Sequence, residues 1–135
     1  MKEELSALLD HSKNYTMAVA DAMPETGYAF KPAESVWNFG ELMHHIGYGI
    51  HWWEENYVKG KKMDWDPPAA PGNKKEITRY LQEAYHSLQE TINTQKLDDN
   101  AMAGFHATLD HITHHRGQAT IYLRCKSIAP PEYVY

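Results

Sequence analysis

Residues 105–123 read FHATLDHITHHRGQATIYL, a stretch in which apolar side chains recur at steps of three and four residues. This period is typical of an amphipathic α-helix that packs one face on a core. The apolar stripe consists of Phe105, Leu109, Ile112, Ala119 and Leu123. The pattern predicts a helix from about Ala103 to Lys126, and Pro130 and Pro131 end any helical tendency beyond it.

Three further segments show the same period, and they run from about Lys2 to Ala22, from Phe39 to Val58 and from Lys74 to Thr94. Asn38 precedes Glu41, and Asn73 precedes Glu76, at the three-residue spacing of a helix-capping pair. No alternation of β-branched and polar residues is long enough to predict a strand. The sequence therefore predicts an all-α fold, a four-helix bundle that forms a single domain over residues 1–135.

The connectors between these segments hold most of the proline and glycine. Residues 28–37 read as an extended connector, and residues 59–73 contain three prolines and a glycine near their end. About 15 extended residues can span roughly 50 Å, whereas a 20-residue helix is about 30 Å long. The second connector can therefore cross the full length of the bundle, which predicts that the second and third helices run parallel.

Composition excludes several classes of protein. The 135 residues carry a formal net charge of −5, and the lysines and arginines are scattered, so we expect no nucleic-acid partner. No apolar run approaches the roughly 20 residues needed to cross a bilayer, so we expect no membrane partner. Cys125 is the single cysteine and cannot form an intrachain disulfide. We treat it as an incidental thiol and expect a reducing, cytoplasmic location.

Histidine is the most unusual feature of the composition, with nine in the chain and four of them between positions 106 and 115. His111 and His115 are four residues apart, so they share one face of the predicted helix and can chelate one ion. His106 and His114 point away from that face. The metalloprotease helix has the same spacing but places Glu after the first histidine, where this chain has Ile112.

Two ligands hold a transition metal poorly, so a third is expected from a neighbouring helix. The segment 39–58 offers His44, His45 and His51, and helical position prefers His45 at the edge of the apolar stripe. His44 is expected further from the core. Gly47 and Gly49 each cost a helix about 1 kcal/mol relative to alanine, so their presence indicates a close backbone approach or room for a ligand.

Other polar and aromatic residues have simpler interpretations. Arg116 falls within an apolar stripe, where a guanidinium must be paired, and we expect a structural ion pair with a carboxylate such as Glu41. His11, His51 and His86 are expected to be solvated. Trp37, Trp52, Trp53 and Trp65 are expected to fill the core and interfaces.

Several of these runs resemble the DinB/YfiT-like superfamily. Residues 111–118 (HITHHRGQ) with 122–124 resemble that family's final helix, and residues 39–46 (FGELMHHI) resemble its second helix. Residues 22–32 and 128–131 resemble its first connector and its C-terminal tail. The resemblance implies a four-helix bundle with long crossover connections, often dimeric, and a metal bound by three histidines. The ligand positions carry over to His45, His111 and His115.

Three imidazoles leave coordination positions open, as in catalytic metal sites. The resemblance implies a metal-dependent enzyme of the thiol-transferase or hydrolase type, which acts on a small-molecule substrate, with a low-molecular-weight thiol as a cosubstrate. Zinc and nickel are the preferred metals, with iron and manganese as further candidates. Trp52, Gln118 and Tyr122 are the pocket candidates, and the chain is expected to form a homodimer. The alternatives are a non-catalytic metal-binding or stress-related dimer and a metal-free helical dimer.

Overall fold

The structure is a computed structural model and describes residues 1–134. The elements are α1 (Lys2–Ala22), a 3₁₀ turn η1 (Glu25–Gly27), α2 (Phe39–Trp53), a π-helix η2 (Glu54–Val58), α3 (Lys74–Thr94) and α4 (Asp99–Cys125). Residues 1–134 contain no strand, which confirms the prediction of an all-α fold.

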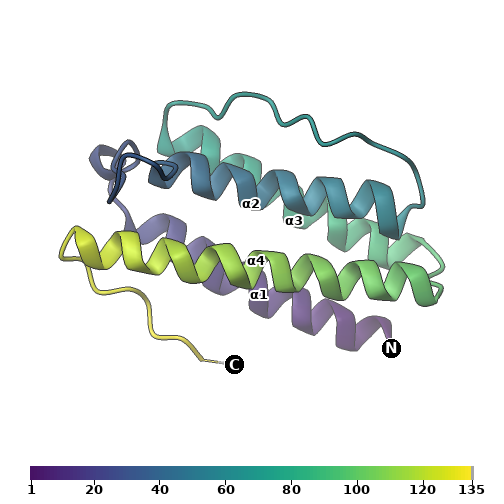
Figure 1. The fold of residues 1–135 in the computed structure, drawn as a ribbon. Coiled ribbons are helices and arrows are strands. Elements are labelled where there is room, and N and C mark those ends of the chain that lie inside the picture. The colour runs from purple at the N-terminus through teal and green to yellow at the C-terminus, as the bar shows by residue number, and fades with distance from the viewer. Residues whose placement is uncertain (135) are drawn as a thin grey trace.

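The four helices form a bundle in which α1 and α4 run in one direction and α2 and α3 run in the other (Figure 1). Both α1 and α2 pack against α3 and α4. Residues 59–73 cross the length of the bundle beside α2 before α3 begins (Figure 1), so α2 and α3 are parallel as predicted. This topology places α2 next to α4, the two helices whose histidines were singled out.

The capping residues set the beginnings of α2 and α3. The Asn38 side chain accepts a hydrogen bond from the backbone N–H of Glu41 at 2.7 Å, and the Glu41 carboxylate accepts one from the backbone N–H of Asn38 at 3.0 Å. Asn73 accepts from the backbone N–H of Glu76 at 2.9 Å. Each contact satisfies a backbone donor that has no partner within the helix.

The last helix begins earlier than its apolar pattern predicts. The carboxylate of Asp98 accepts a hydrogen bond from the backbone N–H of Ala101 at 2.8 Å, and this cap places the first residue of α4 at Asp99 instead of Ala103. The first turn carries few large apolar side chains, so the hydrophobic period alone did not reveal it.

The C-terminal end of the second predicted helix is a π-helix that buries Glu54. Its carboxylate accepts hydrogen bonds from Thr91 and, at 2.9 Å, from the Ser87 hydroxyl on α3, and it lies 3.5 Å from the Lys59 ammonium. A buried carboxylate is costly unless it is paired in this way. The predicted segment to Val58 was correct in extent, but its last five residues are not α-helical.

Arg116 is buried as expected, but the predicted ion pair with Glu41 is wrong. The guanidinium donates to the carbonyl oxygen of Ser12 at 3.3 Å and lies near the Thr16 hydroxyl at 3.4 Å. The ring of Tyr15 lies below it at 4.8 Å. Glu41 is used in the cap of α2, and none of the ion pairs within residues 1–134 includes Arg116. Carbonyl, hydroxyl and aromatic groups thus stabilise this charge.

The core lies between the inward faces of all four helices. Its fully buried side chains include Leu9 and Val19 from α1, Phe39 and Ile46 from α2, Leu81 and Leu88 from α3, and Phe105 and Ile112 from α4. None of the helices within residues 1–134 combines the length and apolar character that crossing a bilayer requires.

Candidate metal centre

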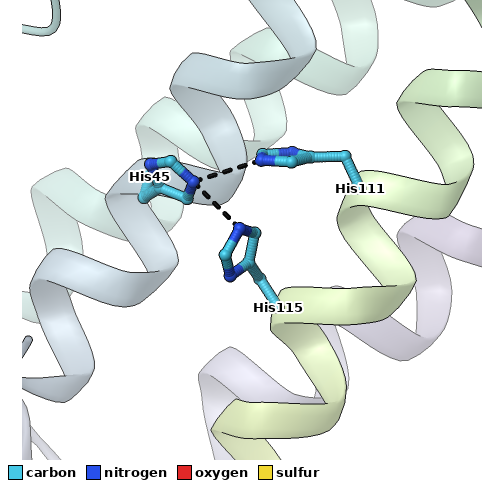
Figure 2. A group of neighbouring side chains, drawn as sticks. All are labelled: His45, His111 and His115. Carbon is cyan, nitrogen blue, oxygen red and sulfur yellow. Dashed lines mark hydrogen bonds between the residues drawn. The ribbon is translucent and has the colours of Figure 1, made fainter. Parts of the chain in front are cut away.

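Three histidines from two helices meet beside the core, as predicted. His45 projects from α2 toward His111 and His115 on α4 (Figure 2). The Nε2 atom of His45 lies 3.1 Å from Nε2 of His111 and 3.0 Å from Nε2 of His115. All three residues offer nitrogens that lie within 4.8 Å of one another. The structure therefore brings the expected ring nitrogens to a common point.

A glycine on α2 provides the space for one of these rings. A β-carbon at Gly49 would lie 2.5 Å from Cε1 of His111 and 2.6 Å from its Nδ1, which is closer than atoms can approach. The sequence indicated a close approach at this position, and the imidazole of His111 makes it. Gly47 has a different role, because a β-carbon there would meet the ring of Tyr80 on α3 at 2.7 Å.

A side chain on α4 orients His115. The Oε1 atom of Gln118 lies 2.9 Å from Nδ1 of His115. An amide oxygen only accepts, so in this contact Nδ1 carries the hydrogen and Nε2 keeps its lone pair. Gln118 thus holds the tautomer in which Nε2 of His115 can bind a cation.

The environment keeps the imidazoles neutral. Burial, and then the neighbouring His115 and His111, lower the pKa of His45 to about 4. Burial, and then His115, lower the pKa of His111 to about 4. Burial also lowers the pKa of His115, although its hydrogen bond with Gln118 acts in the opposite direction. At neutral pH the rings are therefore in the form that donates a lone pair to a metal.

The donor set fits a divalent transition metal. Nε2 of His45 faces Nε2 of His111 and Nε2 of His115, but it can donate at most one hydrogen to them. Nε2 of His115 carries a lone pair, because the hydrogen of this ring is on Nδ1. Nδ1 of His111 is buried without a hydrogen-bond partner among residues 1–134. Metal–imidazole bonds are about 2.0–2.1 Å long, so two imidazole nitrogens that bind the same ion lie within roughly 4 Å of each other. The two Nε2–Nε2 separations of 3.1 and 3.0 Å satisfy this limit, and an ion would satisfy the facing lone pairs.

Two tryptophans border the cluster, which the sequence interpretation missed. The ring centre of Trp37 lies 4.5 Å from that of His45. The ring centre of Trp65, a residue of the crossover connector, lies 5.4 Å from that of His45. Trp52 and Trp53 pack on each other at 5.2 Å and are half-buried, whereas Trp37 and Trp65 are exposed, so the expectation that the tryptophans fill the core is wrong. Since Trp37 and Trp65 lie in connectors, no helical period could place them relative to His45.

A pocket of about 490 Å³ opens beside His115. It is lined by Ser35, Val36, Trp37, Leu42, His115, Gln118, Ile121 and Tyr122. Two of the three pocket candidates, Gln118 and Tyr122, are among these lining residues. The third, Trp52, is not part of the lining. Its indole N–H donates to the carbonyl oxygen of Met63 at 3.0 Å, near the start of the crossover connector.

Most of the other histidines lie at the surface. His11, His86 and His114 are exposed, as predicted, and His106 and Cys125 are exposed as well. His44 was expected further from the core but is buried, with its ring stacked on that of Tyr80 at 4.5 Å. His51 was expected in solvent but is half-buried, with Nδ1 3.9 Å from the Glu54 carboxylate. Aromatic residues on α3 and the π-helix cover positions that an isolated helix would expose.

The fold and the cluster define a class: a four-helix bundle with a three-histidine centre between its second and last helices. A family model described as the DinB superfamily matches residues 8–119, and the chain belongs to this superfamily. This confirms the family that the sequence motifs resemble.

Two solved structures show the same fold. One is a DinB-like protein from Bacillus cereus, 15% identical, with a TM-score of 0.79 and coverage of 98% of this chain and 97% of that one. Another is a DinB-like protein from Bacillus subtilis, 20% identical, with a TM-score of 0.67 and coverage of 94% and 96%. A comparison with curated proteins found no match.

Proposed function

We propose that this protein is a metal-dependent thiol transferase, in which His45, His111 and His115 hold one zinc or nickel ion and a small molecule is the substrate. The observation that carries the proposal is the convergence of three neutral imidazoles beside an open pocket. Three protein ligands with open positions are typical of catalytic metal sites, whereas structural sites are closed by four.

The pocket favours thiol chemistry over hydrolysis. Activation of water usually uses a carboxylate or another base beside the metal. The lining of the pocket beside His115 holds no carboxylate, and Glu41 lies with His45 in a separate pocket of about 180 Å³. A bound divalent ion lowers the pKa of a thiol, so that thiol chemistry needs no separate protein base. In the overall reaction the thiol sulfur bonds to an electrophilic carbon, the leaving group departs with its electron pair, and the thiol proton passes to water.

The residues of the chain contribute binding and orientation. Gln118 holds His115 in the tautomer with a free Nε2, and Gly49 gives His111 its position. Trp37 covers one side of His45 and limits its contact with water. The pocket beside His115 positions the substrate against the histidine cluster.

The test begins with metal analysis of protein purified without a metal column. We expect about one zinc or nickel per chain, and loss of that metal in His111→Ala. His106→Ala is the matched control, because His106 is an exposed histidine on the same helix. Conjugation of a small electrophile by several thiols is then assayed with all three proteins. Absence of stoichiometric metal, or conjugation that persists in His111→Ala, contradicts the proposal.

A further inference from the structure

The pocket beside His115 is lined by several apolar side chains that are exposed to solvent. Val36, Trp37 and Ile121 expose 38%, 45% and 55% of their surface, and all three face this one pocket. Leu42 is fully buried and lies at the same pocket. Apolar side chains that gather around one concavity indicate a binding site, whereas single exposed ones do not.

The polar groups of the pocket are few and largely satisfied. The Tyr122 hydroxyl donates to the carbonyl oxygen of Trp37 at 2.7 Å, so its ring is what remains for a ligand. The Oε1 atom of Gln118 is occupied by His115. The remaining side-chain donors and acceptors are the amide NH₂ of Gln118, the hydroxyl of Ser35 and Nε2 of His115, which the proposed metal would occupy.

The charged side chains around the pocket disfavour anions at positions away from the metal. No lysine or arginine lines it within residues 1–134. Burial, and then the negative charge of Glu41, raise the pKa of Tyr122, so the field of Glu41 reaches the pocket wall. Away from the metal at His115, an anionic group in this pocket would lose water without gaining a cationic side chain, and it would also meet the like charge of Glu41.

We propose that the apolar walls of this pocket, away from His115, bind an uncharged group of the substrate in preference to a carboxylated one. The volume of about 490 Å³ accommodates a ring or a short alkyl chain against Trp37, with the reactive end of the molecule toward His115. This inference rests on the proposed function for its placement of the reaction, but the preference for an apolar group can be measured by itself.

The test compares two probes that differ by one carboxylate, phenylmethanethiol and 4-(mercaptomethyl)benzoate. Binding to metal-loaded protein is followed by calorimetry, and the same ring pair without sulfur, toluene and 4-methylbenzoate, is titrated into metal-free protein by tryptophan fluorescence. We expect the uncharged member of each pair to bind on the order of tenfold more tightly, since the carboxylate would be desolvated without a partner.

A charge variant gives the converse result. Ile121→Lys places a cation on the pocket wall and should narrow or reverse the preference, by on the order of tenfold toward the carboxylated probe. Leu8→Lys is the matched control, because Leu8 is an exposed leucine on α1 outside the pocket. It should leave the preference unchanged. Metal content should be the same in all three proteins.

The outcomes are separable. Equal or tighter binding of the carboxylated probes by the unmodified protein overturns the inference, as does an unchanged preference in Ile121→Lys. If no probe binds and Ile121→Lys dissociates a dimer, this surface is the contact between two copies of the chain. That result also overturns the inference. Absence of metal alone contradicts the proposed function only. The binding of toluene and 4-methylbenzoate to the metal-free protein then decides whether the pocket prefers the uncharged ring.

Discussion

At Gly49, a missing β-carbon leaves the space in which the His111 ring lies. The contact explains why a residue that costs helix stability is placed in the middle of α2. An alanine there must displace the imidazole, because the helix backbone of α2 cannot move without loss of core packing.

We expect Gly49→Ala to lower metal affinity by on the order of tenfold or more, as is typical when the support of a metal ligand is lost. The helix itself should be retained. Gly117→Ala is the control, since a β-carbon at this exposed position of α4 meets nothing within 4 Å. It should leave metal binding unchanged and stabilise the fold by up to about 1 kcal/mol. Competition with a chromophoric chelator measures the affinities, and equal values for the two variants would contradict the prediction.

The lowered pKa values of His45 and His111 predict a pH dependence of stability for the metal-free protein. Well above pH 6.5 both imidazoles are neutral in the folded and unfolded states. As the pH falls from 6.5 to about 4, the unfolded imidazoles bind protons and the folded ones do not. The unfolded state therefore binds more protons, and the free energy of unfolding should decrease over this range.

Urea unfolding at a series of pH values, in the presence of a chelator, measures this dependence. The double variant His45→Gln/His111→Gln should show a shallower decrease between pH 6.5 and 4. Carboxylates elsewhere contribute equally to both proteins, so the difference isolates the two histidines. Parallel curves would show that the imidazoles are not held in the neutral form.

At the scale of the helix, the cap of α4 has an effect that the histidine pattern does not reveal. Asp98 determines where α4 begins, and α4 carries two of the three clustered histidines. We expect Asp98→Ala to lower the free energy of unfolding by about 1 kcal/mol, because the backbone N–H of Ala101 loses its acceptor. Asp98→Asn keeps an acceptor and should differ by only a few tenths of a kcal/mol. Equal losses for the two variants, measured by urea unfolding, would exclude the cap as the cause.

The π-helix at the end of α2 is a second element that periodicity could not identify. Its buried Glu54 is held by two hydroxyls of α3 and by Lys59. A hydrophobic pattern marks apolar positions only, so a carboxylate that is buried by hydrogen bonds reads as a surface residue. The same limit explains why His51, next to Glu54, was wrongly expected in solvent.

At the scale of the whole molecule, the C-terminal tail links the helices around Arg116. The Tyr15 hydroxyl donates to the carbonyl oxygen of Pro131 at 2.8 Å, and the Tyr133 ring lies 5.6 Å from the Arg116 guanidinium. We expect Tyr133→Ala to destabilise the fold by about 1 kcal/mol, the energy of an exposed cation–π contact. Tyr133→Phe keeps the ring and should be close to neutral. Thermal unfolding measures the stability of the two variants. Equal melting temperatures would show that the Tyr133 ring does not stabilise the Arg116 guanidinium.

A metal held by the cluster would join α2 to α4, so its effect should appear in global stability. We expect zinc or nickel at a hundredfold excess over Kd to stabilise the protein by about 3 kcal/mol, which for a domain of this size is on the order of 10 °C. His45→Ala should abolish the increase, and the exposed-histidine variant His86→Ala should not. An equal rise in all three proteins would indicate metal binding elsewhere.

The expected homodimer stays a prediction. Analytical ultracentrifugation can measure the mass of the protein in solution.

Local periodicity determined much of this protein without tertiary information. The spacing of apolar residues placed α1 and α3, and it separated His111 and His115 from the neighbouring His106 and His114, because each depends only on helix geometry. The length of residues 59–73 predicted the parallel pair of helices, since chain reach is also a local property.

Only the tertiary structure decided the surroundings of the cluster. Trp37 and Trp65 reach His45 from connectors, and the partners of Arg116 come from α1 and the tail. The buried state of His44 depends on an aromatic ring of α3. Such contacts join residues far apart in the chain, and no helical period relates them. Their distances depend on how the helices pack, which the order of the residues along one helix does not specify.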